Sequence, residues 1–203
     1  FAPAALRNRQ VVVEQLTKLG FLAHTPTKMY EVASGTGAHA CLIADLFPEV
    51  TIQCTDLEAE MCAVITSAAE GRGSVLPPTV LDVTSAPDAW PSPPDWPAAV
   101  DFVLNMNMIH ISPPETTGGL LAGAHRLLAP GAALVLYGPF VMGAAGLFPE
   151  SNHGFDEWLK ARDPRFGIRN LEDVAGKAAG VGLHLASVTP MPANNWLAVF
   201  RKV

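Results

Sequence analysis

The chain has 203 residues and a mass of 21.4 kDa, with 49% apolar and 16% charged residues. A chain of this size and composition can bury the core of one α/β domain and is not globally disordered. Its formal net charge of −6 argues against a general nucleic-acid binder, and no stretch is long and apolar enough for a membrane helix. The N-terminus lacks an apolar signal core, so we expect a cytoplasmic protein; a leader removed before Phe1 is an open alternative.

Helical and extended segments alternate along the chain. Apolar residues at helical spacing predict helices at residues 4–20, 38–47, 58–70, 116–128, 152–161 and 170–179. Short apolar runs predict strands at residues 28–33, 50–55, 78–81, 100–106, 132–137, 183–189 and 195–201. Residues 83–98 are rich in proline, and we expect a stiff surface loop within the domain rather than a linker between domains.

This alternation predicts a mainly parallel sheet with helices on both faces. Only residues 190–194 join the last two strands, which is too short for a helical crossover, so these strands must pair antiparallel. We therefore predict a single α/β domain over residues 1–203, with a Rossmann-like, doubly wound, seven-stranded sheet. The sheet is expected to be mostly parallel and to end in an antiparallel C-terminal hairpin.

The three cysteines are Cys41, Cys54 and Cys62, an odd number without the short paired spacing of a disulfide framework or a zinc site. We expect small, partly buried free thiols in a reducing compartment. The histidines show no convincing metal-ligand spacing with cysteines or carboxylates, so we predict no metal site.

The main motif is a strand-to-helix turn at residues 31–37, with the sequence EVASGTG. Gly35 and Gly37 allow the backbone to turn sharply and to approach a ligand closely. The helix that follows aims its free N–H groups at whatever lies there. Glu31 places a charge inside a buried strand, which is costly unless the charge has a partner.

Two further acids follow the next two strands. Asp56 ends the second strand, 19 residues after Gly37, and suits a carboxylate that binds ribose hydroxyls. Asp82 follows the third strand, where it could accept a hydrogen bond from an adenine amino group; a turn cap is the alternative. A dinucleotide fits the turn, with Ala40 as its third small residue, but does not call for an acid at Glu31. The three acids together favour S-adenosylmethionine, a nucleoside with an amino group and no phosphate.

Residues 31–37 resemble the first motif of class I S-adenosylmethionine-dependent methyltransferases, with Ala33 in place of the first glycine. Four segments look like the small methyltransferase-like family first catalogued as domain of unknown function 938. These are EVASGTGAH (31–39), NMNMIHIS (105–112), YGPF (137–140) and PANN (192–195). The resemblance implies a class I fold and S-adenosyl-L-methionine as cofactor, with S-adenosyl-L-homocysteine as product, and leaves the methyl acceptor open.

Cofactor-binding groups are expected at the carboxyl ends of the strands. The helix over residues 1–20 could fold over the cofactor, with Arg7 and Asn8 reaching its carboxylate; a solvated helix face is the alternative. The residues predicted to bind the cofactor are Arg7, Glu31, Ser34, Gly35, Gly37, His39, Asp56, Leu57, Asp82, Val83 and Asn105.

Methyl transfer from a sulfonium is an in-line displacement that needs aligned reactants and, in some cases, a base. His110 follows the fourth strand and could be that base, or a structural histidine bonded to backbone. Asn107 could point into the same pocket, and Tyr137, which ends the fifth strand, is a further catalytic candidate. The predicted substrate-binding residues are Asn194, Asn195 and Arg169. A turn-forming role for the asparagines and an exposed ion pair for the arginine are the alternatives.

The sequence thus predicts an S-adenosylmethionine-dependent methyltransferase acting on a small molecule, with neither nucleic acid nor membrane as partner. One alternative is a cofactor-binding interaction or regulatory subunit without turnover. Another is an NAD(P)-dependent oxidoreductase. The chain could act as a monomer or a homodimer.

Overall fold

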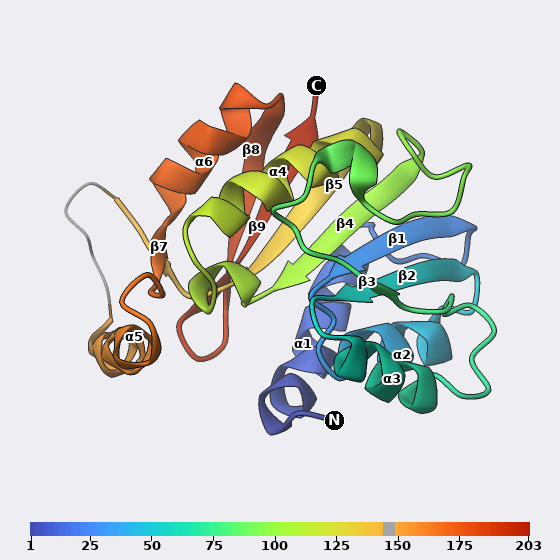
Figure 1. Cartoon of the computed structure of the whole chain (residues 1–203), viewed down its shortest axis with the longest axis horizontal. Helices are drawn as coiled ribbons and strands as arrows, with labels where there is room; N and C mark the ends of the chain where they lie inside the picture. The colour runs from blue at the N-terminus through green and yellow to red at the C-terminus, as the bar shows by residue number, and fades with distance from the viewer. Residues whose placement is uncertain (144–148) are drawn as a thin grey trace.

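The structure is a computed structural model that describes residues 1–143 and 149–203, and a twisted sheet runs through its centre (Figure 1). Within these residues, seven strands form the sheet in the order β3-β2-β1-β4-β5-β9-β8. They are β1 (Thr27–Val32), β2 (Val50–Asp56), β3 (Thr79–Val80), β4 (Val100–Met106), β5 (Leu128–Gly138), β8 (Leu183–Met191) and β9 (Asn195–Lys202). The predicted seven-stranded α/β sheet is confirmed.

The strand pairing follows the predicted pattern. β1 pairs parallel with β2 and β4, β2 with β3, and β4 with β5. β9 pairs antiparallel with both β5 and β8, which confirms the C-terminal hairpin. Because the parallel strands all end at one edge, the chain leaves β1, β2, β3 and β4 on the same side of the molecule.

Helices cover both faces of the sheet (Figure 1). They are α1 (Pro3–Lys18), α2 (Ala38–Leu46), α3 (Ala59–Ala68), α4 (Glu115–Leu127), α5 (Glu150–Arg162) and α6 (Leu171–Gly180). One apolar cluster joins α1, α2 and α3 to the sheet through Leu16, Ile43 and Ile65. A second cluster joins α4 and α6 to the opposite face through Leu120 and Val174.

The proline-rich segment at residues 83–98 differs from the simple surface loop that we expected. It includes the short helix η1 (Pro87–Ala89), and its two tryptophans, Trp90 and Trp96, are only 2% and 3% exposed. A Cβ atom on Gly123 of α4 would lie 2.2 Å from the Trp90 ring, so glycine is needed for this close approach. The segment is therefore part of the core that covers α4.

Two short features were not predicted. β6 (Phe140–Val141) and β7 (Arg169–Asn170) form a second, parallel, two-stranded sheet, and strands of two residues are too short to show a periodic pattern. β5 also begins at Leu128, four residues before the predicted start at 132, because Leu128 pairs with Val100 ahead of a register shift.

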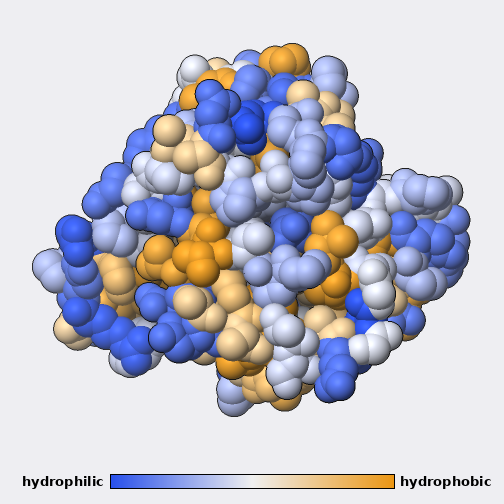
Figure 2. Space-filling view, turned by 45° about the vertical axis from the view of Figure 1, so that its right-hand side comes forward, coloured by the Kyte–Doolittle hydropathy of each residue, from blue (hydrophilic) through white to orange (hydrophobic). Residues whose placement is uncertain are grey.

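Figure 2 shows the side of the molecule that lies to the right in Figure 1, where hydrophilic residues surround separate apolar clusters. In the part of the chain that the structure describes, no helix is long and apolar enough to cross a membrane. Cys41, Cys54 and Cys62 are buried free thiols, as expected.

Candidate active site

A pocket of about 320 Å³ opens where β1, β2, β3 and β4 end. The short helix η2 (Met108–His110) and the start of α4 close its other side. Its lining residues are Val32, Ala33, Gly35, Asp56, Leu57, Glu58, Leu81, Asp82, Val83, Met106, Met108, Ile111, Ser112 and Thr116. Of the predicted cofactor-binding residues, the structure brings Gly35, Asp56, Leu57, Asp82 and Val83 together here.

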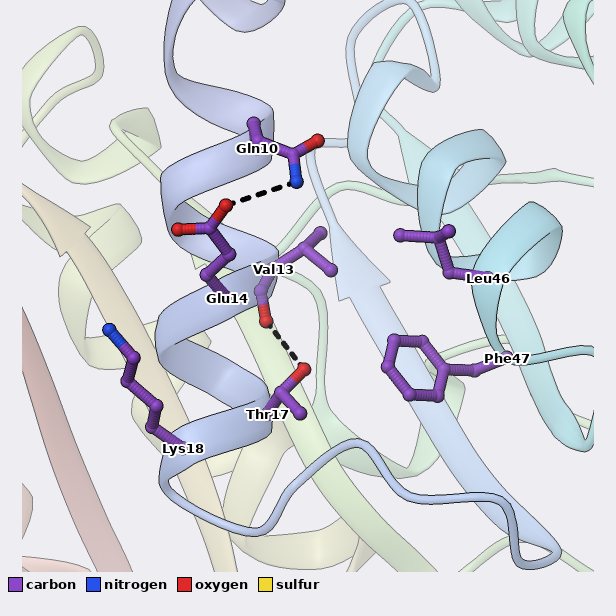
Figure 3. Close-up of a pocket in the computed structure, with 7 residues that line it drawn as sticks. All are labelled: Gln10, Val13, Glu14, Thr17, Lys18, Leu46 and Phe47. Atoms are coloured by element: carbon purple, nitrogen blue, oxygen red, sulfur yellow. Dashed lines mark hydrogen bonds between the residues drawn. The ribbon is translucent and has the colours of Figure 1, made fainter.

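A second groove, of about 380 Å³, lies between α1 and the end of α2 (Figure 3). It is lined by Gln10, Val13, Glu14, Thr17, Lys18, Leu46 and Phe47, none of which is a predicted site residue. Within α1, Gln10 donates to Glu14 at 3.1 Å and Thr17 donates to the Val13 carbonyl at 2.8 Å. These polar groups already have partners within their own helix, and we assign no function to the groove.

The glycine turn is held in shape by backbone hydrogen bonds and by Asp56. The Gly35 N–H donates to Asp56 Oδ2 at 2.8 Å, and the Gly37 N–H donates to the Ser34 carbonyl at 2.9 Å. Gly35 and Gly37 have φ angles of 56° and 73°, in the left-handed region that favours glycine. A Cβ atom on Gly35 would meet nothing within 4 Å, so open space for a ligand lies directly against this backbone.

Ala33, the departure from the family motif, lines the pocket in a strained conformation. Its φ is 56°, where residues with a side chain are disfavoured by about 1–2 kcal/mol. The turn therefore keeps the glycine-type geometry although the first glycine is replaced.

Glu31 lies beneath this turn and is 1% exposed. Its carboxylate oxygen Oε2 lies 3.8 Å from the Cys54 sulfur, and its backbone carbonyl accepts from the Ser34 hydroxyl at 3.2 Å. Burial, and to a smaller extent the negative charge of Asp56, raises the pKa of Glu31 to about 7. Near neutral pH the Glu31 side chain is therefore close to its point of ionisation, and a bound cation would favour its carboxylate form.

The other two acids face the pocket. Asp82 is exposed, and its Oδ1 accepts from the Thr84 hydroxyl at 2.7 Å and the Thr84 N–H at 2.8 Å, which lowers the pKa of Asp82. Asp82 therefore both caps its turn and lines the pocket. Among the described lining residues there are three acids, with Glu58, and no lysine or arginine. The lining therefore suits hydrogen-bond donors and a cation rather than a phosphate group.

Two of the predicted cofactor-binding residues, Asn105 and His39, are buried and do not line the pocket. Asn105 is 1% exposed, and its Nδ2 donates to the Val32 carbonyl at 3.0 Å, tying the end of β4 to the end of β1. His39 is 5% exposed, and its Nε2 lies 3.1 Å from Asn8 Oδ1. Burial, with a contribution from the charge of Arg9, lowers the pKa of His39 to about 4, so the ring is neutral at pH 7.

The first half of α1 lies beside the glycine turn. The Ala2 N–H donates to the Thr36 hydroxyl at 3.0 Å, and the Asn8 side chain is hydrogen-bonded to both His39 and Tyr137. Tyr137 is 3% exposed, and burial raises its pKa. Arg7, in contrast, is an exposed residue that does not line the pocket.

The structure does not bring the predicted substrate-binding residues to the pocket lining. Asn194 Nδ2 donates to the Ser151 hydroxyl at 2.7 Å, and Asn195 Nδ2 donates to the carbonyls of its own turn. The Arg169 guanidinium donates to backbone carbonyls, including those of Ile109 at 2.9 Å and Ser112 at 2.7 Å. These contacts hold loops together. They agree with the turn-forming role given above as the alternative for the asparagines. For Arg169 they indicate a structural role, in which the side chain braces the backbone.

His110 and Asn107 lie next to the pocket but not in its lining. His110 is fully buried, its carbonyl accepts from the Gly167 N–H at 3.0 Å, and its ring meets the Phe140 ring edge-on at 5.0 Å between centroids. Burial, together with the nearby charge of Arg169, lowers the pKa of His110 to about 3. A base this weak does not suit the general-base role that the sequence suggested.

One wall of the pocket was not predicted from the sequence. Met106, the last residue of β4, forms this wall together with four residues that follow β4 or lie in the first turn of α4, which are Met108, Ile111, Ser112 and Thr116. Their position directly after a strand end, on both sides of Asn107 and His110, was the available signal. No single local periodicity marks these residues, since they belong to the end of β4, to η2, to the connection after it and to the start of α4.

The comparisons with known proteins agree on the fold. The sequence model of a family described as "Protein of unknown function (DUF938)" matches residues 1–202. Similar structures include the pyocyanin biosynthetic protein PhzM, with a TM-score of 0.72 and 15% identity over 93% of this chain and 53% of that one. The S-adenosylmethionine-dependent methyltransferase SibL has a TM-score of 0.73 and 16% identity over 98% of this chain and 55% of that one.

A third similar structure is a candidate sarcosine dimethylglycine methyltransferase from Galdieria sulphuraria. It has a TM-score of 0.72 and 14% identity over 97% of this chain and 86% of that one. The chain thus spans about half the length of PhzM and SibL but most of the Galdieria protein. At these identities the likeness shows a shared fold, the class I methyltransferase fold.

Proposed function

This chain belongs to the DUF938 family of proteins of unknown function, and we propose that it is an S-adenosylmethionine-dependent methyltransferase with a small-molecule acceptor. The observation that carries the proposal is the pocket at the carboxyl ends of the strands. It combines apolar walls, two acids at adjoining strand ends and a glycine backbone open to a ligand.

The residues present suit each part of an adenosine. Asp56, at the end of β2, would accept hydrogen bonds from the ribose hydroxyls, and Asp82 would accept one from the adenine amino group. Leu57 and Val83, 58% and 7% exposed, offer apolar surface to the adenine ring.

The amino-acid end of the cofactor would lie at the glycine turn. There the ionised form of Glu31 would stabilise the cationic amino group, directly or through water. When bound, S-adenosylmethionine supplies a methyl group activated by a sulfonium. The residues of the pocket would hold that methyl group in line with the acceptor, and the apolar side chains of Met106 and Met108 would exclude water from it.

Two other functions are less well supported. An NAD(P)-dependent oxidoreductase would bind a pyrophosphate, and no lysine or arginine stands among the described residues that line the pocket. A cofactor-binding subunit without turnover would share this pocket and differ only on the acceptor side. The proposal further takes the protein to be cytoplasmic, with the net charge of −6 arguing against nucleic acid as substrate.

Titration calorimetry with S-adenosylmethionine, S-adenosylhomocysteine and NADH tests the proposal. We expect the first two to bind, with affinity in the micromolar range, and NADH not to bind. Asp56→Ala should weaken binding by about tenfold or more, because it removes hydrogen bonds to a charged group. Glu60→Ala, in the first turn of α3, is a matched control that removes a carboxylate outside the pocket lining. Absence of binding by both sulfur compounds would refute the proposal.

Turnover is tested separately. Purified protein incubated with isotopically labelled methyl donor and a metabolite extract should transfer label to a small molecule. Transfer of label to none, together with tight cofactor binding, would favour the subunit without turnover.

A further inference from the structure

Two hydroxyl side chains that line the cofactor pocket are in contact with each other. Ser112 lies in the connection between η2 and α4, Thr116 lies in the first turn of α4, and their hydroxyl oxygens are 2.7 Å apart. The Ser112 oxygen also lies 2.7 Å from the Met108 carbonyl oxygen, and the Thr116 oxygen lies 2.6 Å from the Pro113 carbonyl oxygen. We call Ser112 and Thr116 the hydroxyl pair.

The number of hydroxyl protons decides how the hydroxyl pair meets a ligand. Two hydroxyl groups carry two protons, and three short contacts share them, one within the pair and one from each oxygen to a carbonyl. Whether a hydroxyl donates to the other member of the pair or to its own carbonyl, both protons are used within the protein. The hydroxyl pair therefore presents oxygen lone pairs to the pocket and acts as an acceptor of hydrogen bonds.

The packing of α4 brings the hydroxyl pair close to Asp82. A Cβ atom on Gly119 would lie 2.0 Å from the Val83 carbonyl oxygen, so α4 packs directly on the residue that follows Asp82. Thr116 is three residues before Gly119, and residues at this spacing lie on the same face of a helix. The hydroxyl pair is therefore about one helical turn from the contact between α4 and the Asp82 turn, and Thr116 and Asp82 line the same pocket.

Asp82 by itself satisfies only half of an adenine amino group. Its Oδ1 already accepts from the N–H and the hydroxyl of Thr84, so Oδ2 is the oxygen that would meet a ligand. An amino group has two hydrogens, and one carboxylate oxygen in the plane of the adenine would take one of them. The second hydrogen needs another acceptor in the pocket, because a donor that is removed from water without a partner weakens binding.

Resting on the proposed methyltransferase function, we infer that the hydroxyl pair of Ser112 and Thr116 accepts the second hydrogen of the adenine amino group and makes the pocket selective for an unsubstituted amino group. Asp82 and the hydroxyl pair then hold one hydrogen each. A purine with an oxygen in place of the amino group turns a lone pair towards both acceptors. An N6-methylated adenine keeps one hydrogen, and its methyl group takes the place of the other hydrogen at one of the acceptors.

The backbone that carries the hydroxyl pair is held in place by the protein itself. The Arg169 guanidinium donates to the Ser112 carbonyl at 2.7 Å and to the Ile109 carbonyl at 2.9 Å. The Thr116 N–H donates to the Pro113 carbonyl at 3.1 Å. The acceptor oxygens are therefore positioned before a ligand binds, which reduces the entropy lost on binding.

Titration calorimetry of the wild-type chain with three ligands tests the inference. The ligands are S-adenosylhomocysteine, its N6-methyl derivative, and S-inosylhomocysteine, in which an oxygen replaces the amino group. We expect S-adenosylhomocysteine to bind at least about tenfold more tightly than either of the others, because a site built to pair a donor rejects analogues that lack it.

The double variant Ser112→Ala/Thr116→Val removes both hydroxyl groups with little change of volume. It should weaken binding of S-adenosylhomocysteine by about tenfold and leave the N6-methyl derivative unaffected, so that the two ligands bind about equally. Discrimination against S-inosylhomocysteine should persist, since Asp82 is intact. Thr116→Ser, which keeps the hydroxyl, should keep the wild-type ratio. Thr66→Val in α3 is the matched control, because it removes a hydroxyl outside the pocket lining that donates to the carbonyl four residues earlier.

Two results would overturn the inference. One is wild-type protein that binds the N6-methyl derivative as tightly as S-adenosylhomocysteine. The other is a double variant in which both ligands weaken by the same factor, as a purely structural role of the hydroxyls predicts. If the double variant does not fold, the single variants Ser112→Ala and Thr116→Val replace it, and at least one of them must lower the ratio. Wild-type protein that does not bind S-adenosylhomocysteine refutes the proposed function, whereas binding with an unchanged ratio refutes only the role of the hydroxyl pair.

Discussion

Replacing Glu31 by glutamine should change how stability depends on pH. The folded-state pKa of Glu31 is raised by burial from the ordinary 4.5 to about 7, so folding favours the protonated form. Stability from this group is fully present below pH 4.5 and is lost as pH rises through 7. A shift of this size corresponds to about 3 kcal/mol in total, of which about 2–3 kcal/mol falls between about pH 5 and pH 8.5.

Urea unfolding of the wild type and of Glu31→Gln across that range measures the effect. Glutamine is neutral throughout, so the variant should gain about 2–3 kcal/mol relative to the wild type as pH rises. The lowered pKa values of His39 and His110 make both proteins less stable as pH falls below 6.5, and this contribution cancels in the difference. Glu60→Gln on α3 is the control and should run parallel to the wild type.

A difference between wild type and Glu31→Gln that is flat with pH would refute the reasoning about burial. The same pair tests the role of Glu31 toward the cofactor. Affinity of the wild type for S-adenosylmethionine should rise with pH near 7, as the carboxylate forms, and the affinity of Glu31→Gln should not.

The remaining predictions concern small residues around the pocket. A Cβ atom on Gly119 would lie 2.0 Å from the Val83 carbonyl, so Gly119→Ala should cost about 3 kcal/mol or more in thermal unfolding and weaken cofactor binding. Gly118→Ala, one residue earlier in α4 and facing open space, should instead stabilise by up to about 1 kcal/mol; equal effects would contradict the packing argument. Ala33→Gly should leave stability unchanged or raise it by up to about 1 kcal/mol, and a clear loss in thermal unfolding would show that the turn is not strained. Gly37→Val should abolish cofactor binding in calorimetry, because a branched side chain fits poorly at a φ of 73° against Ile65; retained affinity would refute this.

Much of the fold could be predicted because its signals are local. The bounds of β4 match the prediction at both ends, since its apolar run is bounded by turn residues. The antiparallel hairpin followed from the length of one connection, residues 190–194. The pairing of β6 with β7 joins two dipeptides that are far apart in the chain, and no local sequence pattern predicts this pairing.

For the site, the residues that stand at the strand ends could be identified from the sequence alone. Gly35, Asp56 and Asp82 were identified from their positions after strands, and the structure brings them to one pocket. Arg7, Asn194 and Asn195 were chosen by residue type and lie outside its lining, because the chain directs their side chains to other contacts or to solvent.

The charge and the hydrogen-bonding state of buried groups, in contrast, depend on how the chain packs. The acidities of Glu31 and His110 depend on burial and on neighbours such as Arg169, which is 59 residues away from His110 in the chain. Local sequence patterns specify helices and strands because those are built from near neighbours. Desolvation and long-range hydrogen bonds exist only once distant segments have packed together, so the protonation of a buried side chain is a property of the fold.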